Sequence, residues 1–332
     1  MPKNYNRVNK RKPQFKLNWK PSPFDARDLK STRHLRVSAE PLPSEFTLPI
    51  KTPVYQQGGL GSCTANSGCS CYRYEAAQLG KAVEPSRLFL YYNTREIEGT
   101  AQDDSGAYIR DVFKALNKKG LCEEKFFPYI ESTFRNKPSQ EAYNNGLNYQ
   151  TVRYTAVPKD LTQMKQTIFS GAVISFGFLV YSSFFGKWDK TTGVMPLPKK
   201  GERIEGGHAV SLVGFSDSRK CFLVLNSWGT GWGQSGLFWM PYDFFMSQDT
   251  SDYWCIDEIK IVEAVVPTPI PTPTPIPTDT FKSGLKRVLS KPDLIKMTEP
   301  LIVRIGKELG LQSSTLLTKN ENVDMVWNYL NK

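Results

Sequence analysis

One cysteine of this chain stands where a thiol can become a nucleophile. Cys63 follows Gly61 and Ser62 and directly precedes residues 64–79, whose pattern predicts a helix. The N-terminus of a helix carries partial positive charge, which lowers the pKa of a thiol and favours the thiolate. Gln57 lies six residues upstream, and its side-chain amide can donate a hydrogen bond. We therefore expect a reactive thiol with an amide donor beside it.

A histidine and an asparagine complete the groups that a thiol nucleophile needs. The chain has two histidines, His34 and His208, and only the second lies in an apolar segment typical of a folded core. Asn226 follows the next apolar run. A thiolate, an imidazole and a side-chain amide in this order are the groups of a cysteine hydrolase. In that chemistry the Gln57 amide and the backbone N–H of Cys63 form the oxyanion hole.

Three blocks of sequence around these residues resemble the signature blocks of the papain-like cysteine peptidases. The resemblance extends from about residue 42 to about residue 260 and is strongest toward prokaryotic and large-virus members. It implies a cysteine-type endopeptidase that acts on peptide or protein substrates and uses neither a cofactor nor a metal ion. The blocks are Gln57-Gln-Gly-Gly-Leu-Gly-Ser-Cys63, Gly206-Gly-His208-Ala-Val and Asn226-Ser-Trp228-Gly.

The resemblance assigns two more residues to the substrate cleft. It implies that the backbone of Gly106 binds an extended substrate and that Trp228 shields the bond between asparagine and imidazole from water. Taken alone, Gly106 equally fits a turn before a helix N-cap. Thr64 stands where papain has tryptophan, and Gly207 stands where papain has aspartate. Neither departure removes a catalytic group, but the second predicts a different pH profile.

Two other functions fit the same residues. One is a different thiol acyl transfer on the same fold, as in an exopeptidase, a deamidase or a peptide ligase. The other is a binding protein that keeps the fold without turnover. The presence of all four catalytic positions argues against the second, and the lack of an obvious insertion across the cleft favours the endopeptidase.

The order of the expected elements indicates an α+β protein with two lobes and a cleft between them. Helices come first and short strands rich in Val, Ile, Phe and Trp come second, so the cysteine and the histidine belong to different lobes. The expected helices are residues 64–79, 86–95, 109–119 and 156–165, and the expected strands are residues 172–181, 208–213, 221–226 and 236–241.

Composition divides the chain into four parts. Residues 1–41 form a basic N-terminal arm, and residues 42–264 form the catalytic domain. Residues 265–279 alternate proline with threonine and isoleucine, which predicts a polyproline II spacer about 40 Å long. Residues 280–332 show helical patterns, and we expect a small module that docks an unknown protein.

The N-terminal arm carries much of the net charge of +11. Residues 1–41 hold 11 Lys and Arg against 3 Asp and Glu, whereas the catalytic domain is nearly neutral. Basic flanks are typical of solvated arms, and contact with a polyanion is the less favoured interpretation. Trp19 and Phe24 either pin the arm to the domain or hold it across the cleft as a pro-segment, which would then be cleaved near residues 40–42.

The cysteines and the hydropathy bear on disulfides and location. Leu60 stands where most papain-like enzymes have a disulfide cysteine, so we expect six thiols and no disulfide framework. No apolar run is long enough for a membrane span, and no signal peptide precedes the arm. We therefore expect a location inside a microbial cell, or in a virus particle or infected cell. The cysteines are Cys63, Cys69, Cys71, Cys122, Cys221 and Cys255.

Overall fold

The chain forms two compact units, residues 1–262 and residues 263–332. The computed structural model describes residues 15–36, 41–49, 53–186, 191–262, 290–313 and 317–331. The start of the basic arm and the whole proline-rich spacer lie outside the described residues. The two units are therefore treated separately below.

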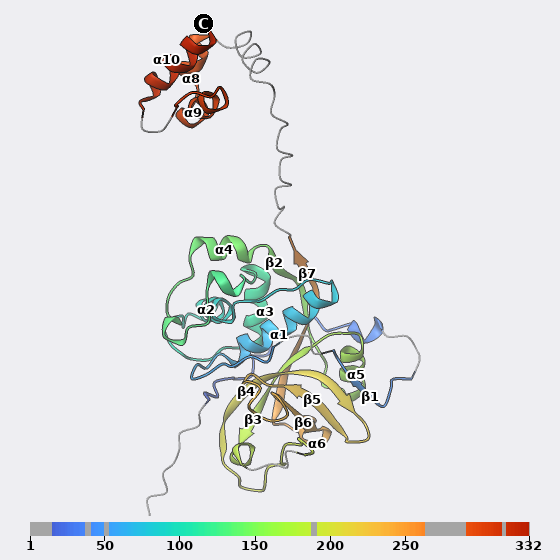
Figure 1. Ribbon diagram of the computed structural model, residues 1–332. Helices are drawn as coiled ribbons and strands as arrows, with labels where there is room; N and C mark the ends of the chain where they lie inside the picture. The colour runs from blue at the N-terminus through green and yellow to red at the C-terminus, as the bar shows by residue number, and fades with distance from the viewer. Residues whose placement is uncertain are drawn as a thin grey trace, which may run out of the picture. The chain divides into compact units, whose positions relative to one another are not determined.

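Four helices of the first unit gather on one side of its sheet (Figure 1). Helix α3 shows why they form: Ile109, Val112, Phe113 and Leu116 recur at helical spacing and are all fully buried. Gly120 then ends the segment with a φ of +72°, a backbone conformation that favours glycine. The helices are α1 (Cys63–Gln78), α2 (Arg87–Ile97), α3 (Ile109–Lys118) and α4 (Gln140–Gly146).

A seven-stranded antiparallel sheet forms the rest of this unit. The strand order is β2-β7-β3-β4-β5-β6, and β1 pairs with the free part of β4. Between β3 and β4 the register places Phe178 opposite His208. The strands are β1 (Glu45–Thr47), β2 (Tyr149–Ala156), β3 (Ile174–Tyr181), β4 (Ile204–Ser216), β5 (Cys221–Leu225), β6 (Leu237–Pro241) and β7 (Thr250–Ile261).

The expected α+β class and two-lobe arrangement are confirmed, but one helix is displaced. We expected a helix over residues 156–165, whereas α5 spans Leu161–Phe169 and the preceding residues form β2. Asp160 sets the true start of α5, because its side chain accepts a hydrogen bond from the backbone N–H of Gln163. The β2 segment becomes a strand because it pairs with β7, a partner about 100 residues away in sequence.

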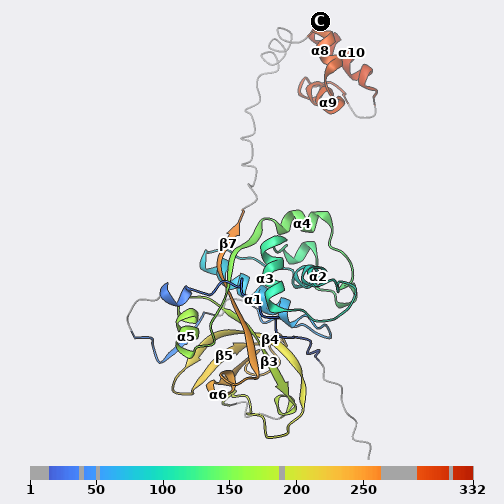
Figure 2. The same ribbon diagram turned by 180° about the vertical axis from the view of Figure 1, so that it is seen from behind.

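Short helices complete the first unit. The 3-10 helix η1 (Arg33–Arg36) lies beside α5 in both ribbon views (Figures 1 and 2). The others are η2 (Glu124–Phe126), η3 (Glu131–Thr133), η4 (Ser182–Phe185) and α6 (Tyr242–Phe245).

The second unit has a small apolar core of its own. Its three described helices are α8 (Lys291–Lys296), α9 (Glu299–Glu308) and α10 (Lys319–Leu330). Residues from all three helices meet in the core, namely Leu294, Ile302, Ile305, Leu309, Val323, Val326 and Leu330. These helices agree with the pattern expected for residues 280–332, and docking to a protein stays a prediction.

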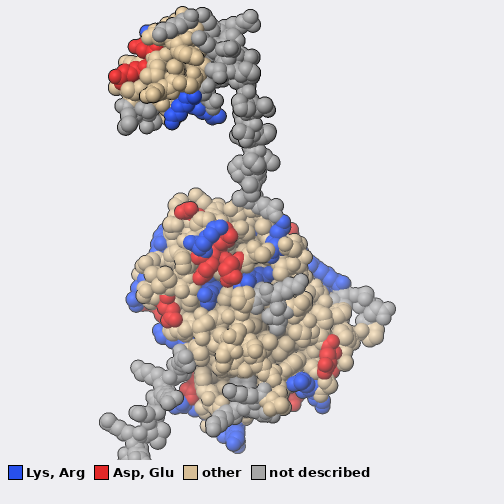
Figure 3. Space-filling model, viewed as in Figure 1, with Lys and Arg blue, Asp and Glu red and all other residues tan. Residues whose placement is uncertain are grey.

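Two surface properties of the described residues bear on partners. Within the described ranges, no helix is both long and apolar enough to cross a membrane. On the face of the first unit shown in Figure 3, basic and acidic side chains adjoin one another and no single sign dominates. Contact of the basic arm with a polyanion stays a prediction, because residues 1–14 lie outside the described part.

Candidate active site

Cys63 is the first residue of α1, the helix at the centre of the first unit. Its side chain is fully buried. Four residues further along, the Ser67 hydroxyl bonds the hydroxyls of Ser175 on β3 and Ser211 on β4, both at 2.7 Å. It also donates to the carbonyl of Val210 at 2.9 Å. This buried polar contact fixes the start of α1 against the strand that carries His208.

His208 and Asn226 are brought together by β4 and the end of β5. The Nε2 atom of His208 lies 2.8 Å from Oδ1 of Asn226, and both side chains are buried. Trp228 stacks on the imidazole, with ring centroids 4.8 Å apart and planes 25° apart. The indole therefore lies on the imidazole, and its role as a shield for the bond to Asn226 stays a prediction.

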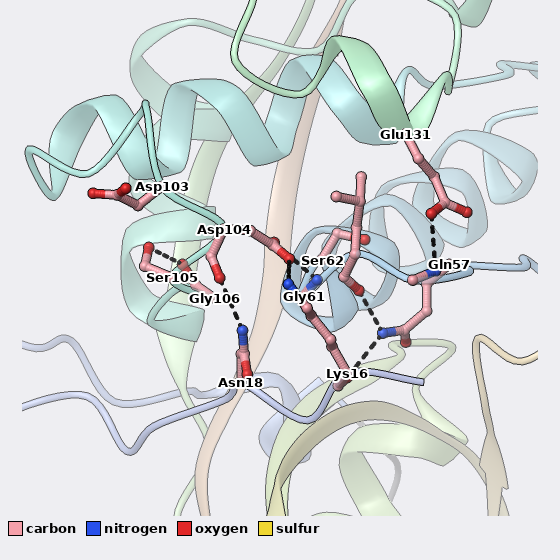
Figure 4. Close-up of polar contacts among 12 residues, drawn as sticks. Lys16, Asn18, Gln57, Gly61, Ser62, Asp103, Asp104, Ser105, Gly106 and Glu131 are labelled. Carbon is pink, nitrogen blue, oxygen red and sulfur yellow. Dashed lines mark hydrogen bonds and ion pairs between the residues drawn. The ribbon is translucent and has the colours of Figure 1, made fainter. Parts of the chain in front are cut away.

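Gln57 is held with its amide nitrogen toward the cleft. The Ser227 hydroxyl donates to Oε1 of Gln57 at 2.7 Å, which fixes the orientation of the amide. Nε2 of Gln57 then donates to the carbonyl oxygen of Leu60 at 3.0 Å and to that of Lys16 at 3.2 Å. Lys16 belongs to the N-terminal arm, so a peptide carbonyl occupies the position expected for a substrate oxyanion (Figure 4).

Residues 15–19 of the arm, here called the cleft segment, run across the site. The backbone N–H of Trp19 donates to the carbonyl of Gly207 at 3.0 Å, next to His208 in sequence. The side-chain amide of Asn18 donates to the carbonyl of Asp104 at 3.0 Å (Figure 4). The Nζ atom of Lys16 pairs with the Asp104 carboxylate at 2.5 Å. The cleft segment therefore touches both lobes.

The backbone of Gly106 lies directly against the cleft segment. Its φ is +75°, and a Cβ atom built there would lie 2.1 Å from the backbone oxygen of Asn18. Nearby, one oxygen of the Asp104 carboxylate accepts from the backbone N–H of Gly61 at 2.9 Å and from the Tyr91 hydroxyl at 2.6 Å. Asp104 thus ties the loop before Cys63 to the loop that carries Gly106, a role that sequence reasoning missed.

The Trp19 side chain packs against β3 and β4, where Gly177 and Gly207 leave room for it, and is almost fully buried. A Cβ atom at Gly177 would lie 1.8 Å from the indole, so only glycine leaves room for it. The indole N–H donates to Oδ2 of Asp252 at 3.3 Å. Asp252 has a φ of +67° and lies at a bulge in β7, which turns its carboxylate toward the arm. Sequence reasoning missed Asp252 because a bulge depends on strand pairing.

The opposite end of the cleft segment is aromatic. Phe15 stacks on Trp228, with centroids 4.5 Å apart and planes 5° apart. Phe185 stacks on the same indole at 5.7 Å. The cleft segment therefore fills space on both sides of Cys63, with Phe15 at one end and Trp19 at the other.

Burial shifts the pKa values of both Cys63 and His208 toward their neutral forms. Burial raises the pKa of Cys63 to about 11, although backbone hydrogen bonds involving Ala209, Thr64 and Asn18 act in the opposite direction. Burial likewise lowers the pKa of His208 to about 4, against the effect of the bond to Asn226. The expected thiolate is thus wrong for the covered chain, because desolvation outweighs the helix dipole.

The structure places most of the expected site residues in one region. Cys63 and His208 are neighbours, because the backbone of Ala209 contacts the sulfur. Among the described residues, however, no hydrogen bond joins them, and the Nδ1 atom of His208 has no partner. Gln57 and Gly106 meet the same stretch of the arm. All six cysteines are free and buried, as expected.

Comparisons with known proteins agree with this geometry. The family model "Papain family cysteine protease" matches residues 48–252. A peptidase C1-like protein of Acanthamoeba polyphaga mimivirus is 41% identical over 226 residues, which cover 64% of this chain and 72% of that protein. A cathepsin B-like protein of Giardia intestinalis is 28% identical over 238 residues, covering 66% of this chain and 75% of its own.

Comparison with a solved structure also indicates a cysteine protease. Xylellain, a cysteine protease from Xylella fastidiosa, superposes with a TM-score of 0.68 at 35% identity, covering 77% of this chain and 99% of its own. The family match spans more than half of the chain and includes the loops and strands that build the site described above. The chain belongs to the papain family of cysteine proteases and is a cysteine peptidase.

Proposed function

We propose that Cys63, His208 and Asn226 form the catalytic triad of an endopeptidase and that Gln57 supplies a donor of its oxyanion hole. The Cys63 sulfur attacks the carbonyl carbon of a peptide bond. The developing oxyanion accepts hydrogen bonds from Nε2 of Gln57 and the backbone N–H of Cys63. His208 passes its proton to the leaving amine, which departs and leaves a thioester on the sulfur.

Hydrolysis of the thioester completes the cycle. His208 takes a proton from water, the hydroxide attacks the thioester carbonyl, and the acid product leaves as the thiolate forms again. Asn226 orients the imidazole without adding a negative charge, so the thiolate and imidazolium remain a pair. Trp228 keeps water from the bond between Asn226 and His208.

The observation that carries this proposal is the Lys16 carbonyl, 3.2 Å from the Gln57 amide nitrogen. A peptide carbonyl is already bound where the mechanism needs one. The chain continues on both sides of it, toward Trp228 in one direction and toward Asp252 in the other. Internal peptide bonds therefore fit the cleft, which favours an endopeptidase over an exopeptidase.

The same contacts support an inhibitory arm. Cys63 and His208 are fully buried and the cleft segment lies across them, so we expect the bound segment to keep a substrate from both groups. Its removal also restores water to the site, which relieves the desolvation that holds both groups neutral. We expect the intact chain to be a zymogen.

A substrate panel tests the endopeptidase proposal. Quenched fluorescent peptides blocked at both ends are compared with peptides that carry a free amine or a free carboxylate, using enzyme without the cleft segment. We expect the blocked peptides to be cut internally and Cys63→Ala to abolish the cleavage. Cleavage confined to free ends would contradict the proposal, as would transfer to an added amine in place of water.

One relative bears on where this peptidase acts. The similarity to a mimivirus protein supports action in a virus particle or an infected cell. Detection of the peptidase in purified particles by mass spectrometry tests this, and its absence from both particles and infected cells would contradict it.

A further inference from the structure

The N-terminal arm is bound to the first unit by two segments of different character. The cleft segment, residues 15–19, lies across the active site. A second stretch, residues 29–33 and here called the anchor segment, lies on the far side of an exposed turn. The contacts of the two segments differ in the charge that they bury: the anchor segment places the Arg33 guanidinium in the interior, whereas the charged Lys16 of the cleft segment is half exposed.

The anchor segment extends the sheet beside β2. The backbone N–H of Ser31 donates to the carbonyl of Ala156 at 2.8 Å, and the N–H of Ala156 donates to the carbonyl of Leu29 at 2.8 Å. Lys30 and Ala156 form a parallel bridge. The Ser31 hydroxyl is buried and lies 3.5 Å from the sulfur of Cys255 on β7. These contacts form an isolated bridge that holds residues 29–31 against the edge of the sheet.

Arg33 adds a buried charge cluster. Its side chain is 4% exposed and pairs with Glu75 of α1 at 2.7 Å and with Asp257 of β7 at 3.5 Å. The Asp257 side chain is 1% exposed and has one further partner, Arg153, at 3.4 Å. Burial raises the pKa of Glu75, and Arg33 opposes that rise. Loss of Arg33 would leave a buried carboxylate without a partner, which is strongly unfavourable.

Release of the cleft segment leaves its carboxylate partners with other donors: Asp252 keeps the Trp254 indole N–H at 2.8 Å, and Asp104 keeps the Tyr91 hydroxyl at 2.6 Å. The Lys16 side chain is 52% exposed where it meets Asp104. The Gln57 amide and the Gly207 carbonyl face the cleft, where water or substrate can replace the arm. Release of the cleft segment is therefore compatible with a folded enzyme, whereas release of the anchor segment is not.

The turn between the two segments is the exposed part of the arm. The Phe24 side chain is 90% exposed, and the Arg27 side chain is 89% exposed. Asp25 and Arg27 bond each other within the turn, and Asp25 makes one longer contact with the body, to Arg110 of α3 at 3.7 Å. A protease can reach this turn more easily than it can reach the paired backbone of Leu29 to Arg33.

We propose that activation removes only the cleft segment, by cleavage within residues 20–27, and that the anchor segment remains a permanent part of the active enzyme. Water adds across one peptide bond, which leaves a carboxylate on the departing segment and an ammonium group on the retained chain. This places the processing site before Asp28 rather than near residues 40–42. It rests on the proposed function only in treating the freed cleft as active.

Limited trypsin digestion of the full chain carrying Cys63→Ala tests the proposal without any turnover by the enzyme. We expect the bond after Arg27 to be cut early and the bond after Arg33 to resist. On gel filtration, the piece that begins at Asp28 should elute with the enzyme, whether or not the bond after Arg36 is also cut. Elution of an Arg33-containing peptide away from an enzyme that stays folded would overturn the proposal.

Hydrogen exchange on the digested sample gives a second readout. The amides of Ser31 and Ala156 should remain protected, and the amide of Trp19 should exchange freely or be lost. The amide of Val157, which donates to the Tyr253 carbonyl at 2.9 Å, reports whether the sheet is intact. Protection of Val157 together with free exchange of Ser31 would contradict a retained anchor.

The mature enzyme provides the direct comparison. Wild-type chain is allowed to become active, labelled with an epoxide thiol trap and measured by intact mass. A labelled species whose N-terminus lies within residues 21–28 supports the proposal, and one that begins at residue 37 or later overturns it. Failure of Cys63 to react in chain without the cleft segment would instead count against the proposed peptidase, so the two failures are distinguishable.

Discussion

The cleft segment and the anchor segment bind the same unit through contacts of opposite kinds. Residues 15–19 bind groups that face the proposed substrate cleft, among them the Gln57 amide and the Gly207 carbonyl. Residues 29–33 bind groups that no substrate reaches, among them Glu75 and Asp257. One arm thus combines a replaceable occupant of the cleft with a permanent edge of the sheet. We infer that a segment of the arm can be released after cleavage only if its release leaves no buried charge without a partner.

The largest expected difference is in the reactivity of Cys63. With its pKa raised to about 11 by burial, only about one molecule in 10⁴ carries the thiolate at pH 7. In the intact chain, alkylation by iodoacetamide should therefore be very slow at pH 7 and rise steeply toward pH 11. Removal of residues 1–19 should make alkylation fast near neutral pH. Equal pH profiles for the two forms would show that the arm does not control the thiol.

Substitution of Gln57 tests whether the group that the cleft segment binds takes part in catalysis. In enzyme without the cleft segment, Gln57→Ala should lower kcat by about 10²–10³ with little change in KM, because the lost bond forms chiefly in the transition state. Ser227→Ala removes only the hydroxyl that orients the Gln57 amide and should cost less. Steady-state kinetics on one blocked peptide measures both variants. A fall confined to KM would argue against an oxyanion role.

Substitution of Arg33 tests whether the anchor segment is needed for the stability of the fold. Arg33→Met should lower the free energy of unfolding by about 3–5 kcal/mol, because it leaves the buried Glu75 carboxylate without its ion-pair partner. Lys16→Met, the matched change in the cleft segment, should alter it by no more than about 1 kcal/mol, since the Lys16 pair is half exposed. Urea unfolding of both full-length variants supplies the values. Similar losses in the two variants would erase the distinction between the segments.

Substitution of Trp19 should have the smallest effect, a modest rise in the activity of the uncleaved chain. Trp19→Phe keeps a ring in the pocket but removes the indole N–H that bonds Asp252. We expect residual peptidase activity of the uncleaved chain to rise about 2–10-fold, the equivalent of one hydrogen bond. In a chain that also carries Asp252→Asn, the same substitution should have less effect. Additive effects of the two changes would show that the bond does not hold the arm.

Much of this site could be read from the order of residues along the chain. Cys63, His208 and Asn226 were predicted to act together because their types and order, and the blocks around them, resemble the papain-like peptidases. Helix α3 could likewise be predicted from the helical spacing of its apolar residues. The start of α5 was not, because pairing of β2 with the distant β7 overrides local preference.

The contacts of the arm could not be predicted for the same reason. Trp19 was visible as an apolar residue on a basic arm, but its pocket requires Gly177 from one strand and Asp252 from a bulge in another. The pKa of Cys63 was predicted with the wrong sign for the intact chain. A helix N-terminus is a local feature, whereas the burial that outweighs it depends on the tertiary packing around Cys63.

The most direct test of the account compares peptidase activity of the intact chain, held uncleaved, with that of a chain that begins at Lys20. The shortened chain lacks the cleft segment and keeps the anchor segment. We predict that it hydrolyses a blocked internal peptide at least about 10²-fold faster and loses all activity on Cys63→Ala substitution. Equal rates for the two chains, with the shortened one fully folded, would contradict the claim that residues 15–19 cover a working active site.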